Sequence, residues 1–419
     1  GRPLHGEEVS LLVDFCRLAL LCNCSWRFSN FYISHREMIE CRDKYIELRD
    51  RIVDLESSAT EAMIRESFLQ LDETSGKHVV FLKDVGVSSL WPKEADHYLG
   101  KDHTTNCFGA DLQPALRVRP GDRIHVQTWD CFHGKVQNVE DFAKSDVWVE
   151  EELNPATGPI YIEGAQPGDT LSVKILDIRT EARGAAMFSK NFGHLGSLCK
   201  PETYGTFFDV SNGIITMKEN PPFPSAPTRT VSWPASPMLG VIGVAPEAGR
   251  ILTMPAGKHG GNLDNNMNKI GSTVYLPVKH PGALLGIGDM HASMGDGEIC
   301  GTGVEIGGDT LIQVDLIKGI QAEFPITETS DSWITHGVHH GDVQGDIQIA
   351  MKHACEEAAH LLVKYWGFSY EDAFIFLGVT SDLGVAQCCH PAKGTVIAKM
   401  RVPKLDICPR PFGHEQSSQ

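Results

Sequence analysis

The sequence predicts a mainly β fold with α+β elements, in which a β-sandwich or barrel core is accompanied by an N-terminal amphipathic helix and by C-terminal helices. Two stretches, 116–130 and 166–178, share one pattern, in which a Pro-Gly-Asp turn is followed by alternating apolar and polar residues. Such alternation is typical of strands with one buried face. Repeated short strands of this kind favour an antiparallel sandwich or barrel over a parallel α/β sheet.

The N-terminal helix is predicted from a capping signal and an apolar seam. Ser34 to Glu37 has the S-x-x-E form of a capping box, and apolar residues then recur at spacings of three and four from Met38 to Ala62. We expect one long amphipathic helix that lies on the protein's own surface. The alternative is a helix that pairs with another subunit.

The remaining elements follow from local patterns of the same kind. Residues 181–235 are rich in proline and glycine, and we expect long irregular loops there. Residues 346–366 carry one apolar face that ends at Gly367, and Ser369 begins a shorter helix. Further strands are predicted at 240–245, 273–278, 283–287, 310–315 and 395–400.

The domain organisation predicted from these patterns has four parts. A helical extension covers residues 1–75, and a first β-rich part covers 76–240. A second β-rich part, which holds the site motifs and the C-terminal helices, covers 241–405, and a tail follows at 406–419.

Composition restricts the partners and the compartment. The formal net charge of −17 argues against nucleic acid or anionic membranes as partners, because both select basic surfaces. The apolar run from Leu11 to Trp26 is too short and too charged to span a bilayer, and Glu7 and Glu8 stand where a signal peptide is basic. The 12 cysteines are dispersed and form no C-x-x-C pair, which is typical of a reducing compartment. We expect a cytoplasmic protein.

The richest chemistry lies in a glycine-rich stretch at 254–305. It contains imidazoles and carboxylates, the donors that divalent cations prefer, at His259, Asp264, Asp289, His291, Asp296, Glu298 and Glu305. In an extended chain, residues two apart point to the same face, so Asp289 with His291 and Asp296 with Glu298 can each present two ligands side by side. The alternative interpretation is a solvated hairpin tip that carries surface charge.

Two further places could carry chemistry. Asp130 ends a predicted strand, where a carboxylate faces a cleft or begins a turn. Glu163 follows a loop at 154–165 that is fixed by prolines and glycines, which is either a structural corner or the wall of a site. The sequence has no G-x-S-x-G elbow, P-loop, H-E-x-x-H or dinucleotide-binding motif. A dispersed Ser/His/Asp triad stays open, as does a cysteine nucleophile, with Cys107, Cys131 and Cys300 near the motifs.

Taken together, these motifs resemble the acetamidase/formamidase family of metal-dependent amidohydrolases over roughly residues 100–405. The resemblance rests on Asn154-Pro-Ala-Thr-Gly-Pro159, Gly243-Val-Ala-Pro246, His259-Gly-Gly-Asn-Leu-Asp264, Tyr275-Leu-Pro-Val278, Gly288-Asp-Met-His-Ala292 with Gly295-Asp-Gly-Glu298, and Asp382-Leu-Gly-Val-Ala-Gln387. It implies a jelly-roll-like sandwich, hydrolysis of a short aliphatic amide, bound divalent cations (zinc first, with calcium as the alternative) and a homo-oligomer. The segment before residue 63 departs from this pattern.

On this basis the residues receive provisional roles. The metal-ligand candidates are Asp130, His259, Asp289 and His291, with Asp264 next. Glu298 is the first choice for the general base and Glu163 the second, while Lys258 or the backbone N–H groups of Gly260 and Gly261 are expected to hold the oxyanion. Two other functions stay open: a metal-dependent hydrolase of acetamide, urea-like, carbamoyl or cyclic amides, and a non-catalytic protein whose cation only holds loops together.

Overall fold

The computed structural model describes residues 95–190, 193–217, 230–320, 322–341, 345–389, 394–405 and 412. All of them belong to the second of two units into which the chain divides, residues 86–419. The predicted N-terminal extension, its helix and nearly all of the predicted tail lie outside the described residues, so those predictions stand as made.

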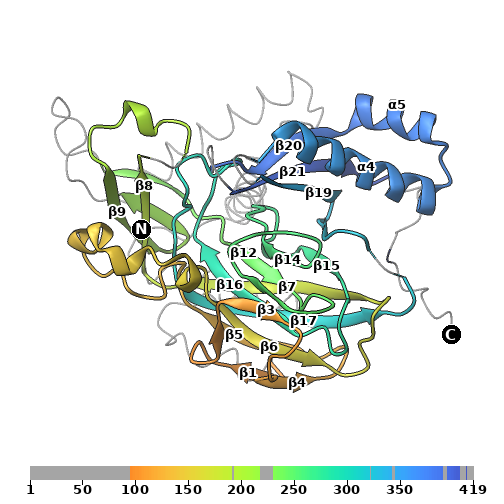
Figure 1. The fold of residues 1–419 in the computed structure, drawn as a ribbon, viewed down its shortest axis with the longest axis horizontal. Coiled ribbons are helices and arrows are strands. Elements are labelled where there is room, and N and C mark those ends of the chain that lie inside the picture. Colours follow the sequence, from red (N-terminus) through yellow and green to blue (C-terminus); the bar gives the residue numbers. More distant parts are fainter. Residues whose placement is uncertain are drawn as a thin grey trace, which may run out of the picture. The chain divides into compact units, whose positions relative to one another are not determined.

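The described part is built mainly from β-sheets, as predicted, and two of these sheets enclose the main core (Figure 1). The larger has nine strands in the order β1 (His97–Leu99), β5 (Arg123–Thr128), β17 (Gly308–Ile317), β7 (Thr170–Thr180), β15 (Thr273–Pro277), β18 (Ile326–Glu328), β19 (Ser332–Gly341), β21 (Gly394–Pro403) and β20 (Asp382–Gln387). The second has β14 (Gly260–Asn262), β12 (Met238–Gly243), β16 (Leu285–His291), β6 (Ala156–Ile162) and β2 (Thr104–Thr105) in order, with β4 (Leu116–Val118) beside β6.

The core lies where apolar side chains from these two sheets meet. Leu171 and Ile312 from the nine-stranded sheet belong to the same buried cluster as Ile160 and Ile287 from the six-stranded sheet. This arrangement agrees with the predicted sandwich. The finer jelly-roll topology stays a prediction.

The two strands around the first Pro-Gly-Asp turn are present but do not pair with each other. β4 pairs in parallel with β6 in one sheet, whereas β5 pairs with β1 and β17 in the other. The turn at Gly121, whose φ is 93°, therefore links two sheets and does not close a hairpin.

The prediction of irregular loops at 181–235 was wrong for most of its described residues. Four strands, β8 (Arg183–Ser189), β9 (Thr203–Ser211), β10 (Ile214–Met217) and β11 (Val231–Pro234), form an antiparallel sheet there. Two glycines that suggested turns instead allow close packing. A Cβ at Gly205 would lie 2.4 Å from the Phe142 ring, and one at Gly184 would lie 2.9 Å from the Glu305 carbonyl oxygen.

The C-terminal helices form as predicted. The Asp346 carboxylate caps α4 (Ile347–Trp366) by accepting the N–H of Gln348 at 2.8 Å, and Gly367 ends the helix in the left-handed conformation at φ 70°. Ser369 caps α5 (Tyr370–Thr380). Both helices lie beside β19, β20 and β21 in Figure 1, and α4 packs on β19 and β21. No helix in the described ranges is long and apolar enough to cross a membrane.

The remaining described elements are short. β3 (Cys107–Gly109) pairs with β13 (Arg250–Leu252), and short 3-10 helices cover Val139–Ala143, Ser145–Val147, Glu150–Glu152 and Gly196–Leu198.

Candidate active site

The site begins on β16, a central strand that is buried along its whole length. Strands covered on both faces are normally apolar, so the two ionisable residues at its end, Asp289 and His291, are exceptional. The Nε2 atom of His291 lies 3.5 Å from Asp289 Oδ1 and 3.1 Å from Oε2 of Glu305, whose backbone bridges to His291. One imidazole is thus placed between two carboxylates.

A third carboxylate, that of Asp264, reaches the same place from the loop after β14. It meets Asp289 above Gly240 in β12, where an added Cβ would lie 2.8 Å from Asp264 Oδ1 and 2.6 Å from Asp289 Oδ2. Only glycine leaves room for both carboxylates at this position.

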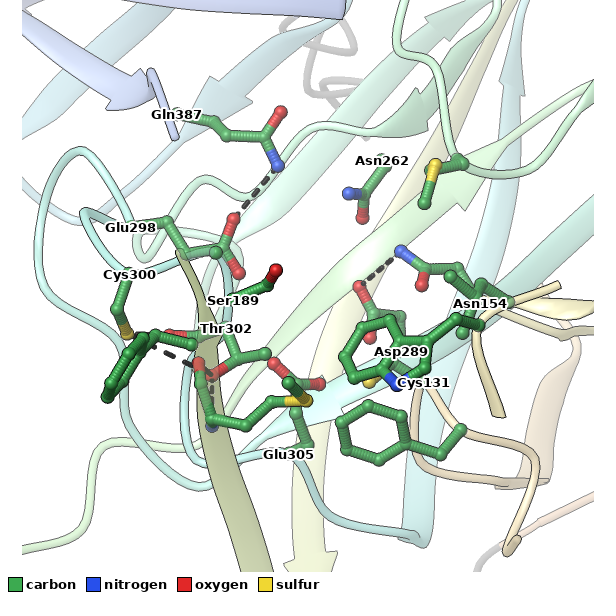
Figure 2. Close-up of a pocket in the computed structure, with 17 residues that line it drawn as sticks. Cys131, Asn154, Ser189, Asn262, Asp289, Glu298, Cys300, Thr302, Glu305 and Gln387 are labelled. Atoms are coloured by element: carbon green, nitrogen blue, oxygen red, sulfur yellow. Dashed lines mark hydrogen bonds between the residues drawn. The ribbon is translucent and has the colours of Figure 1, made fainter. Parts of the chain in front are cut away.

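Two side-chain amides hold the carboxylates in position. Nε2 of Gln387 donates to Glu298 Oε2 at 2.9 Å and also to Asp264 Oδ2, while Nδ2 of Asn154 donates to Asp289 Oδ2 at 3.2 Å (Figure 2). A bridge between Gly297 and Gln387 brings the loop of Glu298 to the end of β20. The cluster therefore gathers side chains from 154 to 387 in the chain.

The backbone of the site is strained at several of these residues. Asn154, Asp264, Asp289 and Glu298 have φ values of 51°, 41°, 51° and 46°. Residues other than glycine rarely adopt this left-handed conformation, which costs of the order of 1 kcal/mol or more and concentrates at functional sites. Four such residues around one point indicate that the fold maintains a particular arrangement of side chains.

Burial makes the cluster electrostatically costly. Asp264, Asp289, Glu298 and Glu305 are each at most 6% exposed, and no Lys or Arg in the described part of the chain forms an ion pair with them. Burial raises the pKa of Asp264 well above its usual value, raises that of Glu298, and raises that of Glu305 to about 8. Burial alone would lower the pKa of His291, but the carboxylates of Glu305 and Asp289 raise it well above 6.5.

The donor set fits a divalent cation. Several buried atoms of the cluster have no hydrogen-bond partner among the described residues: Asp264 Oδ1, Asp289 Oδ1, Glu305 Oε2 and both ring nitrogens of His291. Of these, only His291 Nε2 and the carboxylate oxygens of Asp289 and Glu305 approach one another as ion pairs. Native proteins rarely leave such groups unpaired. Within each of three overlapping groups of residues, the possible ligand atoms lie within 4.8 Å of one another. The groups are Asp264, Asp289 and His291; His291, Glu298 and Glu305; and Cys131, Asp289 and Glu305.

A small cavity opens onto the cluster (Figure 2). Its volume is about 70 Å³, and Asp289, Glu298 and Glu305 contribute its carboxylates. The remaining wall is largely apolar and includes Cys131, Phe132, Trp148, Leu153, Met187 and Met254. An apolar cavity with a few convergent polar groups is the usual form of a site for a small ligand.

Four of the residues predicted from the sequence meet in this cluster, namely Asp264, Asp289, His291 and Glu298. Asp130 lies nearby but is occupied otherwise. Its Oδ1 accepts the N–H groups of Phe132 at 2.9 Å and Gly134 at 3.0 Å, so it shapes the loop that presents Cys131 and Phe132 to the cavity.

Three other predicted residues are not among the groups of close ligand atoms in this cluster. His259 is buried, with its ring edge-on to Phe108 at 5.3 Å, and burial lowers its pKa to about 4. Its Nε2 has no hydrogen-bond partner among the described residues. Lys258 is exposed and pairs with Glu323. Glu163 follows β6 as predicted, yet it is exposed in a shallow depression beside the His97–Asp122 ion pair.

The cysteines left open as nucleophiles divide in the same way. Cys131 and Cys300 line the cavity, whereas Cys107 lies in the β3–β13 pair. Burial raises the pKa of Cys131 well above its ordinary value, which keeps the thiol protonated and weakly nucleophilic.

Sequence reasoning did not assign roles to Glu305, Asn154, Asn262 and Gln387. All four lie inside stretches singled out for their glycines or their motifs, and Asn262 stands in the same His-Gly-Gly-Asn-Leu-Asp run as Asp264. Isolated amides have no characteristic spacing, so only the fold shows that they reach the cavity.

Comparisons with known proteins identify the family and agree with the fold. A family model described as the acetamidase/formamidase family matches residues 93–251 and 244–390. The acetamidase of Mycolicibacterium smegmatis is 27% identical over 384 residues, which covers 71% of this chain and 93% of that protein. The formamidase of Methylophilus methylotrophus is 31% identical over 343 residues, covering 65% and 82%.

A solved structure gives the same assignment. The crystal structure is that of a recombinant predicted acetamidase/formamidase from Thermoanaerobacter tengcongensis. It superposes on this chain with a TM-score of 0.66 at 35% sequence identity, and the match covers 73% of this chain and 95% of that one. The family match and the relatives identify the chain as an amidohydrolase. The chain belongs to the acetamidase/formamidase family.

Proposed function

We propose that the protein hydrolyses short linear amides, R–CO–NH2, to a carboxylate and ammonia, with formamide as the first substrate to test. The family assignment supports amide hydrolysis, because its curated relatives include an acetamidase and a formamidase. The observation that carries the proposal is the small cavity that ends on Asp289, Glu298 and Glu305.

The cavity's size favours a short acyl group. An engineered cavity of about 150 Å³ in another protein holds benzene, so a cavity of about 70 Å³ suits a ligand of only a few non-hydrogen atoms. Formamide and acetamide differ by one methyl group, which a pocket distinguishes by only about 1–3 kcal/mol. Acetamide therefore remains the second candidate.

The proposal includes a bound divalent cation, zinc first and calcium as the alternative. Asp264, Asp289 and His291 would hold it, with Glu305 beside them, since these residues carry the unpaired buried donor atoms. When bound, such a cation polarises a carbonyl and lowers the pKa of a bound water toward about 7. The test is elemental analysis of the purified protein and of His291→Ala, which we expect to lose the cation and the activity together.

Glu298 is the proposed general base. It lines the cavity, burial raises its pKa, and Gln387 donates to its Oε2, so that Oε1 remains to take the proton of the attacking water. After attack, the same carboxyl group would return the proton to the departing nitrogen, which leaves as ammonia.

The two alternative functions are separated by one panel of substrates. Ammonium and carboxylate would be measured with formamide, acetamide, propionamide, urea and a cyclic amide. Release from the linear amides, decreasing as the acyl group grows, supports the proposal. Turnover of only urea or the cyclic amide would assign another hydrolase reaction. Cation binding without turnover of any compound would favour a non-catalytic role.

We also propose a homo-oligomer, and the surface of α5 supports it. Phe374, Ile375 and Val379 are 78%, 65% and 76% exposed, and no charged residue lies between Asp372 and Asp382. A helix so apolar on its outer side is normally covered by protein. Light scattering would give the oligomeric state, and Phe374→Glu is expected to reduce it.

The cytoplasmic location and the absence of nucleic-acid and membrane partners stay predictions. The cysteines in the described ranges are free thiols, which supports a reducing compartment. Subcellular fractionation tests the location.

A further inference from the structure

Three side-chain amides, those of Asn154, Asn262 and Gln387, line the cavity. The NH2 groups of Asn154 and Gln387 are engaged by carboxylates of the cluster. Asn262 differs from them. It is 5% exposed, yet its Oδ1 has no hydrogen-bond partner, and no side-chain hydrogen bond of Asn262 occurs within the described part of the protein.

The position of Asn262 is fixed by the fold. It is the last residue of β14, and its backbone pairs with Val241 of the central strand β12. In the view of Figure 2, its side chain lies between those of Gln387 and Asn154, on the side of the cavity opposite Glu305. An unpaired buried acceptor costs about 1–3 kcal/mol, so a residue held here without a partner indicates that a ligand supplies one.

We infer that the side-chain amide of Asn262 recognises the carboxamide group of the substrate. A primary amide carries an N–H donor and a C=O acceptor side by side, and the asparagine side chain presents the complementary acceptor and donor. Two such groups form a pair of hydrogen bonds with each other. Oδ1 of Asn262 accepts an N–H of the substrate, and its NH2 group donates to the substrate oxygen. The inference rests on the proposed function and assigns its selectivity for amides to one residue.

The consequence is discrimination against esters of the same size. An ester has no N–H to offer Oδ1, so its binding leaves the buried Asn262 acceptor unpaired. Sites built to bond a substrate N–H reject analogues that lack it far more strongly than apolar pockets reject an extra methyl group. Asn262 therefore determines the class of substrate, whereas Phe132 and Trp148 limit its size.

The test compares amide with ester hydrolysis by the metal-replete protein. kcat/KM is measured for acetamide and for methyl acetate with the wild type, Asn262→Leu and Asn262→Ala. We expect the kcat/KM for the amide to fall at least about tenfold in both variants, with the ester value changed less than about threefold. Asn138→Ala, at the start of a 3-10 helix outside the cavity, serves as the matched control and should leave the amide-to-ester ratio unchanged.

Binding measurements keep the inference testable if hydrolysis fails. Saturation-transfer NMR of acetamide and of acetone, which has the same shape but no N–H, is recorded for each variant, with thermal unfolding and metal content as controls. A wild type that binds acetamide without hydrolysing it contradicts the proposed function but still tests Asn262. Equal losses for amide and ester, unchanged acetamide binding in Asn262→Leu, or no amide binding by the wild type would overturn the inference.

Discussion

The stability of the fold depends on a buried neutral histidine, which gives a quantitative prediction. His336 in β19 is fully buried, and its two ring nitrogens have opposite roles. Nδ1 lies 2.9 Å from the Pro325 carbonyl oxygen, to which it donates, and Nε2 accepts from Nδ2 of Asn265 at 2.9 Å. The amide orientation of Asn265 is set by its Oδ1, which accepts the N–H of Met267 at 3.1 Å. Protonation of His336 would place two N–H groups against each other.

The size of the effect follows from the pKa of His336, which burial lowers from 6.5 to about 4. Because the folded pKa lies below the unfolded one, the unfolded chain binds the proton first as the pH falls. The stabilisation is therefore complete above about pH 6.5 and is lost as the pH falls toward 4. A difference of about 2.5 units corresponds to about 3.4 kcal/mol in total, of which about 2 kcal/mol is lost by pH 5.

The assay is urea unfolding of the wild type and of His336→Gln at several pH values from 7.5 to 4.5. The difference between the two proteins at each pH removes the contributions of all other groups, including the acidic cluster. We expect the stability advantage of the wild type to shrink by about 2 kcal/mol between pH 7.5 and 5. A difference that stays constant across this range would refute the neutral-histidine reasoning.

Three further predictions concern single residues. Glu298→Gln is expected to keep the cation while kcat falls about 10²–10⁴-fold, measured by ammonia release with elemental analysis, and near-wild-type turnover would rule out this base. Glu163→Gln should leave kcat within about twofold in the same assay, because Glu163 is exposed away from the cavity; a large loss would return it to the site. Gly205→Ala should lower the free energy of unfolding by about 1–3 kcal/mol, because its Cβ would meet the Phe142 ring at 2.4 Å; an unchanged urea midpoint would contradict that packing.

Several elements of the fold were predictable because one face of each is buried. Alternation marked β7 and β17, and capping residues marked α4 and α5, because burial and orphan backbone groups leave periodic or local signals. The sheet of β8–β11 was missed because its glycines resemble turn residues in the sequence. In the structure, Gly205 instead leaves room for the ring of Phe142, which is distant in the sequence. The sequence also does not show which strands pair with each other. β4 and β5 are neighbours in the chain, but β4 pairs with β6 in one sheet and β5 pairs with β17 in the other.

The site was predictable in part for a similar reason. Asp289 and His291 are two residues apart on one strand, so their proximity is local and visible in the sequence. Asp130 and His259 carry the right chemical groups, but the fold uses the first to shape a loop and buries the second against Phe108. Gln387 reaches the cluster only through the bridge of β20 to Gly297, a contact between residues 90 positions apart that no local pattern encodes.

The most direct test of the account is ammonia release from formamide by the purified protein before and after treatment with a chelator, with elemental analysis of both samples. We expect hydrolysis that disappears with the bound cation and returns when one divalent ion is added back. Hydrolysis that persists after complete removal of the cation would contradict it. The chemistry would then move to a side-chain nucleophile, with Cys131 and Cys300, the cysteines that line the cavity, as the first to replace.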